Sequence, residues 1–356
     1  MKQLETDVVT VDPIYPAEAA IKRAATLLRQ GQLVVFPTET VYGLGADALQ
    51  PAALERIFAA KGRPLSDPLI VHIAEFSALE ELTTSIPEAA WCLTRTFWPG
   101  PLTLILPRGP RVPHLVTAGM ETVAVRVPRH PVARALIRAA GVPVAAPSAN
   151  RFMHVSPTTA QHAVADLGGR VPLILDGGPC EVGVESTILD LSTDIPTILR
   201  PGGVSLEAIR TVLPQVRLPN KQHIAVSEQS AQKAPGQLST HYAPAIPLLL
   251  YDGSEEAMRS AMLHELRLRS ERGEHVGVLI ADRDLPAFVQ ENAGLVYTLG
   301  DAAQPAQIAA KLFASLRALE EAQVQVIICR NFAAHDLGLA IRDRLGRAAG
   351  GQIIVV

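Results

Sequence analysis

The sequence predicts an α/β protein built from two domains. Short apolar runs typical of strands alternate with stretches of helical periodicity, and several of the runs end in polar loops that contain glycine or serine. At 356 residues the chain is longer than one typical domain, and its 48% hydrophobic residues suffice for two cores. Because the alternation continues from end to end, we expect two α/β domains in series.

Residues 33–73 organise the first half of the chain. In order, we expect a strand at 33–36, a polar loop that includes Gly43 and Gly45, a helix at 51–60, a turn that carries Lys61 and Arg63, and a strand at 68–73. Two cations separated by a glycine can hold a phosphate chain, because lysine supplies a point charge and arginine a planar fork. The same turn is also typical of a solvated surface loop. The chain has neither a GxxxxGK[ST] nor a GxGxxG motif, so the turn alone leaves both interpretations open.

The other elements of the first half follow from the same patterns. Helical spacing predicts helices at 17–30, 79–97 with a break near Pro87, 131–140 and 206–213, and apolar runs predict strands at 102–106, 121–127, 142–146, 173–176 and 198–200. Alternation along 121–127 places Thr122 and Arg126 on one face and three valines on the other. Arg126 is therefore either a surface residue at an edge or a site residue.

Polar side chains recur where these strands end. Ser148 and Asn150 follow one strand, and Arg200 stands between an apolar strand and a Pro-Gly-Gly turn. Serine and asparagine can hold a ribose, a phosphate oxygen or a carboxylate, but they are also ordinary turn and cap residues. Ser156 is expected to cap the helix that follows it, whose N-terminus would favour an anion.

Composition limits the classes of function. The chain carries 32 lysine and arginine residues against 35 aspartate and glutamate residues, a net charge of -3, which argues against a broad basic surface for nucleic acid. The three cysteines form no CxxC pair, so neither a zinc site nor a disulfide framework is indicated. No signal peptide or membrane-spanning run is evident, and we expect a soluble, cytoplasmic protein.

Several motifs together resemble a known family. The segments are PTETVYGLG, KGRPLSDPLIVHI, FWPGPLT, VAVRVP, APSAN, VESTILD and ILRPG, spread from about Leu33 to Gly203. They resemble the YrdC-like domain of threonylcarbamoyl-AMP synthases. The later APGQLSTHYAP and the tail to Val356 resemble the linker and C-terminal domain of the long, two-domain form of that family.

This resemblance implies a set of site residues. The family's Lys-x-Arg pair corresponds to Lys61 and Arg63, which would be catalytic, and its Ser-x-Asn pair to Ser148 and Asn150. The L-threonine pocket would comprise Thr40, His72, Arg126 and Ser186, and the ATP side would comprise Arg63, Asp67, Thr122, Ser148, Asn150, Ser156, Arg200 and Tyr242.

Many family members have asparagine at the position of Asp67. A carboxylate there would accept a hydrogen bond from a ribose hydroxyl but repel a phosphate.

The resemblance also implies the architecture. We expect a YrdC-like domain with a twisted mixed sheet at 1–213, a linker or lid at 214–244 and a smaller Rossmann-like domain at 245–356. Within the last, apolar runs at 246–251, 276–281, 295–299 and 324–329 alternate with helical stretches at 255–272, 303–322 and 336–349, a pattern typical of a parallel sheet, and 352–356 would add a strand. Tyr242 would close the lid over ATP.

The implied reaction joins L-threonine, bicarbonate and ATP into threonylcarbamoyl-AMP and pyrophosphate. A tRNA threonylcarbamoyltransferase complex would receive the product, and a weak contact with tRNA is left open. Mg²⁺ is expected on the polyphosphate; its ligands are unknown, since Glu39, Asp47 and Glu185 have no diagnostic spacing, and no general base stands out. The alternatives are an RNA-binding module, against which the charge and the 4% aromatic content weigh, and a carbamoyl transferase that uses carbamoyl phosphate.

Overall fold

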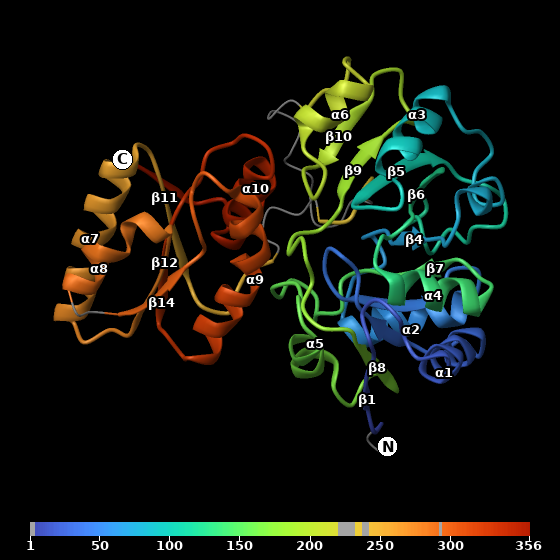
Figure 1. The fold of residues 1–356 in the computed structure, drawn as a ribbon, viewed down its shortest axis with the longest axis horizontal. Coiled ribbons are helices and arrows are strands. Elements are labelled where there is room, and N and C mark those ends of the chain that lie inside the picture. Colours follow the sequence, from blue (N-terminus) through green and yellow to red (C-terminus); the bar gives the residue numbers. More distant parts are fainter. Residues whose placement is uncertain (1–3, 220–231, 237–241, 292–293) are drawn as a thin grey trace. The chain divides into compact units, whose positions relative to one another are not determined.

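The computed structural model describes residues 4–219, 232–236, 242–291 and 294–356. The chain forms two compact units, the first from Met1–Phe152 and Ser156–Gln237 and the second from Met153–Val155 and Leu238–Val356 (Figure 1). Each unit has its own sheet, one mixed and one parallel, so the predicted α/β class is confirmed. No described helix is both long and apolar enough to cross a membrane.

The first unit is built on one twisted mixed sheet. Its elements are β1 (Asp7–Thr10), α1 (Glu18–Arg29), β2 (Val34–Phe36), β3 (Gly43–Asp47), α2 (Pro51–Lys61), β4 (Ile70–His72), α3 (Glu88–Phe97), β5 (Leu102–Pro107), β6 (Thr122–Arg126), α4 (Pro131–Ala140), β7 (Val144–Ala145), α5 (Ala160–Leu167), β8 (Leu173–Asp176), β9 (Thr187–Asp190), β10 (Thr197–Arg200) and α6 (Leu206–Val212). The strand order within the described residues is β1-β8-β2-β3-β7-β4-β6-β5-β9-β10.

Local sequence sets most helix boundaries. Helix α4 begins with Pro131 at its first position, where the missing N–H costs nothing, and Gly141 ends it in the left-handed region at φ 68°. Helix α2 begins and ends in the same way, with Gly62 at φ 66° as its last cap. The expected helix over 79–97 is only partly present: a short 3₁₀ turn ends at Leu79 and α3 starts at Glu88.

Strand β3 was not predicted, because glycines usually mark turns. Gly43–Asp47 pairs antiparallel with β2, with Gly45 opposite Val34. A Cβ atom on Gly45 would lie 2.7 Å from Cε1 of Phe36 and 3.0 Å from Cγ1 of Val144. Glycine is therefore required here by close side-chain packing inside the sheet, and the loop is shorter than expected.

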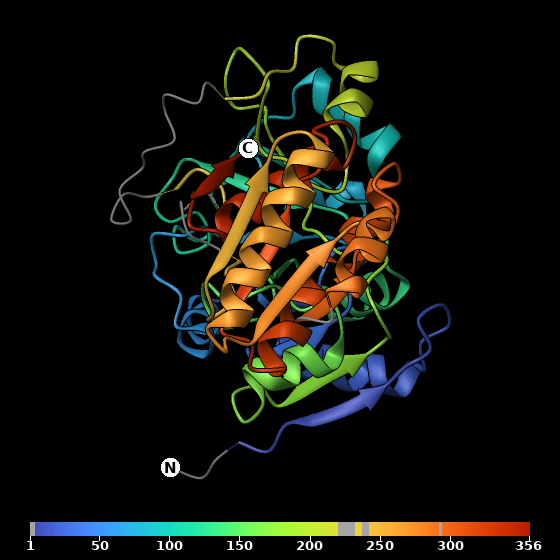
Figure 2. The same cartoon turned by 90° about the vertical axis from the view of Figure 1, so that its left-hand side faces the viewer.

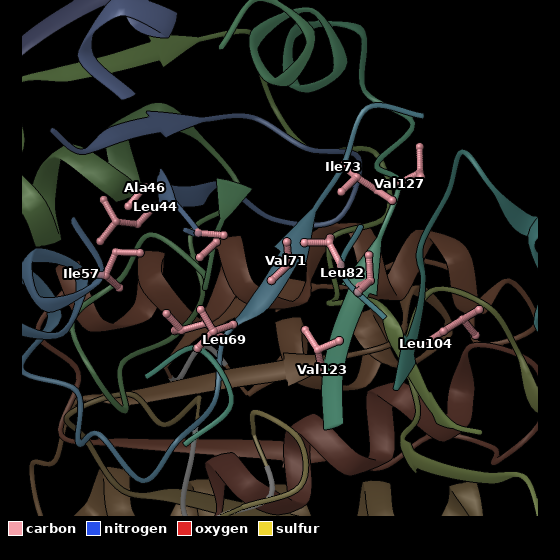
Figure 3. Packing of buried hydrophobic residues seen from close by; sticks show 14 of the residues in the cluster. Leu44, Ala46, Ile57, Leu69, Val71, Ile73, Leu82, Leu104, Val123 and Val127 are labelled. Atoms are coloured by element: carbon pink, nitrogen blue, oxygen red, sulfur yellow. The ribbon is translucent and has the colours of Figure 1, made fainter. Parts of the chain in front are cut away.

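Hydrophobic clusters pack on the sheet of the first unit. One cluster contains Val71, Leu104 and Val123 together with residues of α2, α3 and α6. Figure 3 shows part of this cluster, with Val71 on β4 near Val123 on β6. In the other, α1 and α4 cover β2, β7 and β8. The predicted alternation on β6 is confirmed, because Val123, Val125 and Val127 belong to the first cluster while Ala124 lies on the opposite face.

The second unit is a parallel α/β domain, as predicted. Its elements are β11 (Leu248–Asp252), α7 (Glu255–Glu271), β12 (Val276–Ile280), α8 (Leu285–Gln290), β13 (Leu295–Thr298), α9 (Pro305–Glu321), β14 (Val326–Arg330), α10 (Gly338–Ala348) and β15 (Ile353–Val355). The strand order is β13-β12-β14-β11-β15. Helices α7 and α8 pack on one face of this sheet, and Figure 2 shows α7 in front of the strands.

Candidate active site

The predicted site residues of the first unit gather around one face of its sheet. His72 on β4 pairs in register with Arg126 on β6, so both side chains share this face. Ile70, Ile105, Ala124 and Ile188 form a small apolar cluster on the same face. The opposite face of these strands holds the larger core, so one face is free to carry polar side chains.

One group of polar side chains surrounds Arg126. Its Nε donates to the carbonyl oxygen of Gly100 at 3.1 Å, and its Nη1 donates to Oγ1 of Thr40 at 3.0 Å. Its Nη2 lies 2.7 Å from Oε1 of Glu39. Oγ1 of Thr38 lies 2.8 Å from that of Thr40 and donates to the carbonyl of Val41. The structure thus brings together Thr40, His72 and Arg126, with Glu39 as an additional member.

The charges in this group are a cation, an anion and a neutral imidazole. Burial lowers the pKa of His72 to about 3, and the charge of Arg126 adds to the effect. Burial would raise the pKa of Glu39, but Arg126 and nearby backbone N–H groups outweigh burial, and the pKa is lowered. At neutral pH, Glu39 is therefore a carboxylate and His72 is uncharged. His72 acts here as a hydrogen-bonding group, with Nδ1 3.2 Å from the carbonyl of Ile70.

A second group consists of three buried cations around one carboxylate. Arg63 Nη2 lies 2.8 Å from Oδ1 of Asp67, and its Nε donates to the carbonyl of Asp67 at 3.2 Å. Burial raises the pKa of Asp67, although the charges of Arg63, Lys61 and Arg200 all act to lower it. All four side chains are at most 7% exposed, so their charges are little screened. These four side chains thus place three cations around one carboxyl group.

Lys61 joins the cationic turn to the loop that carries the Ser-x-Asn pair. Its Nζ donates to the carbonyl oxygens of Ser148 at 2.6 Å and Asn150 at 2.5 Å. Asn150 is buried and its Nδ2 donates to the carbonyl of Arg151, whereas Ser148 is half-buried. Both pairs identified in the sequence therefore lie together. Thr122 begins β6 and is half-buried.

A β-bulge directs Arg200 to the site face. Ile198 pairs with Leu189 and Arg200 pairs with Ile188, which leaves one extra residue on β10. Simple alternation would have put Arg200 on the same face as Ile198, which belongs to the core. The guanidinium of Arg200 donates to the carbonyl of Ser186 through Nε and Nη2, at 3.2 and 3.0 Å, and to Oγ of Ser186 at 3.2 Å.

Ser186 and Ser156 occupy buried positions. Oγ of Ser186 lies 2.8 Å from Oγ1 of Thr103, a site-face residue that sequence reasoning missed because its segment has no distinctive polar pattern. The expectation that Ser156 caps a helix is wrong: Thr159 caps α5, and Ser156 Oγ donates to Oε1 of Glu185 at 2.5 Å. The physical reason is that the chain stays extended until Thr159, whose hydroxyl accepts from the N–H of His162.

A short piece of the predicted linker packs in the first unit. The carbonyl of Pro235 accepts from Nη1 of Arg200 at 3.3 Å, and the N–H of Gln232 donates to the carbonyl of Ser66 at 3.1 Å. Ala234 is fully buried in the apolar cluster of the site face. Residues 220–231 and 237–241 of the expected linker lie outside the described residues.

Tyr242 belongs to the second unit. Its ring stacks on Phe313 with a centroid distance of 5.8 Å, and Cζ of Arg344 lies 5.0 Å from the ring centroid. The side chain is 1% exposed. The expected contact of Tyr242 with ATP stays a prediction.

The carboxylates considered for Mg²⁺ have other partners. Glu39 pairs with Arg126, Asp47 accepts from the N–H of Leu49 at 2.9 Å, and Glu185 accepts from Ser156. Within the described residues, no group of three or more histidine, cysteine, aspartate or glutamate side chains has the arrangement of a metal site. The part of the chain that the structure describes thus presents no cluster of metal-binding side chains.

Comparisons with known proteins agree with the motifs. A family model described as telomere recombination matches residues 26–202, and a model described as the C-terminal domain of threonylcarbamoyl-AMP synthase matches residues 204–350. Threonylcarbamoyl-AMP synthase of Bacillus subtilis is 45% identical, covering 99% of this chain and 100% of that protein. The same-named protein of Pyrococcus abyssi is 44% identical, covering 95% and 96%. The crystal structure of P. abyssi Sua5 complexed with L-threonine has a TM-score of 0.92 at 42% identity, covering 98% of this chain and 99% of that one.

The lowered pKa of His72 predicts acid sensitivity of the fold. Because the pKa is near 6.5 in the unfolded chain and about 3 in the folded chain, the unfolded state binds a proton first, and stability is lost as the pH falls through this window. Between pH 7 and pH 4.5 we expect His72 to account for a loss of about 2 to 3 kcal/mol.

Chemical denaturation of the parent and of His72→Gln at both pH values measures this contribution. The variant should lose less stability on acidification than the parent, while His114→Gln, at an exposed histidine of the same unit, should lose as much as the parent. Equal acid sensitivity of the parent and His72→Gln would show that His72 is protonated normally in the fold.

Proposed function

The chain belongs to the threonylcarbamoyl-AMP synthase family, and from this premise we propose that it condenses L-threonine, bicarbonate and ATP into threonylcarbamoyl-AMP with release of pyrophosphate. In terms of reaction class it would be a nucleotidyltransferase, because it moves the adenylyl group of ATP. The observation that carries the proposal is the contrast in charge between the two groups of side chains on one sheet face. One group contains three cations around Asp67, and the other, balanced group contains the ion pair of Arg126 and Glu39.

The gathering of three cations suits a polyphosphate. Lys61, Arg63 and Arg200 all lie close enough to Asp67 to act on its carboxylate, and cations placed together in this way attract a ligand with several negative charges. Arginine forks and a lysine point charge are the side chains that proteins use for phosphate oxygens. We assign ATP to this group, with Ser148, Asn150 and Thr122 beside it.

The balanced group suits an amino acid. We assign L-threonine to Thr40, His72, Arg126 and Ser186, as the family resemblance implies, with the guanidinium of Arg126 as the partner of the substrate carboxylate. Neutral His72 would contribute a hydrogen bond and no charge. Arg200 and Ser186 are hydrogen-bonded to each other, which supports placing the two substrates next to each other.

The chemistry asks mainly for charge neutralisation and alignment. The threonine nitrogen, as the free amine after losing a proton to solvent, adds to carbon dioxide with release of a second proton, or to bicarbonate with loss of water, and forms a carbamate. A carbamate oxygen then attacks the α-phosphorus while pyrophosphate leaves. Nucleophile and target are both anionic, so fixed cations that face the phosphates lower the barrier without having to reorganise. Mg²⁺ would enter on the nucleotide and neutralise phosphate charge when bound.

We propose the domain limits 1–213, 214–244 and 245–356, with the middle segment as a lid. The contacts of Gln232 and Pro235 beside Arg200 support a lid that folds over the cationic group and excludes water from a hydrolysis-prone product. Limited proteolysis within residues 214–244 tests this proposal. ATP together with L-threonine should slow cleavage, whereas an unchanged rate of cleavage would mean that the segment only joins the two domains.

We also propose a cytoplasmic location and transfer of the product to a tRNA threonylcarbamoyltransferase complex, because threonylcarbamoyl-AMP is reactive and needs an acceptor enzyme. Cell fractionation tests the location, and co-purification with a tagged form of the chain tests the partner. Retention of the transferase on the tagged chain would support the partner, and its absence under crosslinking would count against it.

Pyrophosphate release from ATP tests the proposed function. Release should require both L-threonine and bicarbonate, and carbamoyl phosphate should not replace them. Lys61→Ala and Arg63→Ala should lower the rate by about 100-fold or more, because each removes a buried charge next to the phosphates. Circular dichroism verifies folding, and a folded variant with normal turnover would remove that residue from the phosphate site.

Asp67→Asn should strengthen nucleotide binding. Asparagine keeps the shape but removes the negative charge among the three cations, and we expect the KM for ATP to fall by about tenfold. Since burial raises the pKa of Asp67, the parent carboxyl takes up its proton more readily as the pH falls, and the difference between parent and variant should shrink at low pH. A rise in KM would instead indicate that Asp67 accepts a hydrogen bond from the ribose.

A further inference from the structure

The buried carboxylate of Glu39 has no part in the reaction as assigned above. Glu39 lies between Thr38 and Thr40 in the loop that joins β2 to β3 and is 2% exposed, close to the 3% of His72 and Arg126. A carboxylate buried to this extent normally has both an ion pair and hydrogen bonds. Glu39 has the ion pair with Arg126, but within the described residues neither carboxylate oxygen has a well-directed hydrogen bond.

Two hydrogen bonds position the side chain of Arg126, and its guanidinium carries further N–H donors. Of its five N–H groups, one on Nε donates to Gly100 and one on Nη1 donates to Thr40. Its Nη2 lies 2.7 Å from Glu39 without a well-directed hydrogen bond. An incoming carboxylate can therefore pair with Arg126 without breaking the contacts that position it.

Several ionisable groups lie around Glu39. Arg126 on β6, His72 on β4, His130 before α4 and Cys180 after β8 interact with it, and Arg129, Asp176 and Glu181 line the same pocket. Burial lowers the pKa of both histidines and raises the pKa of the Cys180 thiol, so these three groups are neutral at pH 7. Among the carboxylates of this pocket, Glu39 is the one that pairs with Arg126.

An α-amino acid carries a carboxylate and an ammonium group on the same carbon. If Arg126 alone received it, the ammonium group would be buried beside a cation and without a counter-charge, which is strongly unfavourable. A guanidinium and a carboxylate side by side offer the opposite charge to each end of such a zwitterion. Resting on the proposed function, we propose that Glu39 binds the ammonium group of the amino-acid substrate while Arg126 binds its carboxylate.

Two analogues of L-threonine separate this role from a merely structural one. L-Threoninol keeps the ammonium group and lacks the carboxylate, and (R)-3-hydroxybutyrate keeps the carboxylate and lacks the ammonium group. If Glu39 binds the amine, Glu39→Gln should lower the affinity for L-threonine and for L-threoninol by about tenfold or more. The affinity for (R)-3-hydroxybutyrate should stay the same or rise, because Arg126 loses a competing anion.

The experiment is calorimetric titration of the full chain and of Glu39→Gln with the three ligands, in the absence of ATP. Glu81→Gln is the matched control, since Glu81 is exposed, pairs with Arg111 and does not line the pocket of Glu39, and it should change none of the affinities. If Glu39→Gln does not fold, Glu39→Asp replaces it. Shortening the side chain by one methylene should also lower the affinity for L-threonine and L-threoninol and spare that for (R)-3-hydroxybutyrate.

Two results would overturn the inference. Weaker binding of (R)-3-hydroxybutyrate with unchanged L-threoninol would mean that Glu39 only holds Arg126 in place, and unchanged binding of all three ligands would mean that it has no role. Failure of the proposed function has a different signature. There the parent chain releases no pyrophosphate with L-threonine and bicarbonate, whatever the variant binds.

Discussion

The structure of the first unit depends on burying several charged side chains close together. Lys61, Arg63 and Arg200 lie around the carboxylate of Asp67. Moving such groups out of water costs several kcal/mol each, and leaving one without its partner typically costs about 3 to 5 kcal/mol. The fold offsets part of this cost with backbone carbonyls, which accept from all three cations.

The same contacts fix the loops of the site. Lys61 is the last residue of α2, and its bonds to Ser148 and Asn150 hold the loop after β7 against it. Arg200 ends β10 and holds both Ser186 and Pro235. Lys61 and Arg200 therefore each act as a clamp between segments distant in the sequence, besides the role in phosphate binding proposed for them. A substitution at these positions should be judged by loop position as well as by charge.

The sheet divides these tasks between its faces. On β6 the valines pack in the core, whereas Arg126 faces the site beside His72 of β4. Arg126 and Arg200 come from strands, so their geometry is held by backbone pairing as well as by loop packing. The bulge in β10 turns Arg200 away from the core.

Local sequence determined the elements and their chemistry. Pro131 and Gly141 mark the two ends of α4. The alternation of side chains along residues 121–127 predicted that Arg126 lies on the face opposite the three valines. The motif set predicted the family, and the comparisons confirmed it. These properties rest on interactions between residues a few positions apart, which a single sequence displays directly.

Only the tertiary structure decided which charges meet. Arg126 and Thr40 are 86 residues apart, Lys61 and Asn150 are 89 apart, and the pairing of Glu39 with Arg126 follows from the strand order β3-β7-β4-β6. Strand β3 and the bulge before Arg200 could not be predicted from the sequence either. Glycines within a strand give the pattern typical of a turn, and the extra residue of a bulge leaves no local pattern. Such pairings depend on how distant strands order themselves in the sheet, and no short segment contains that information.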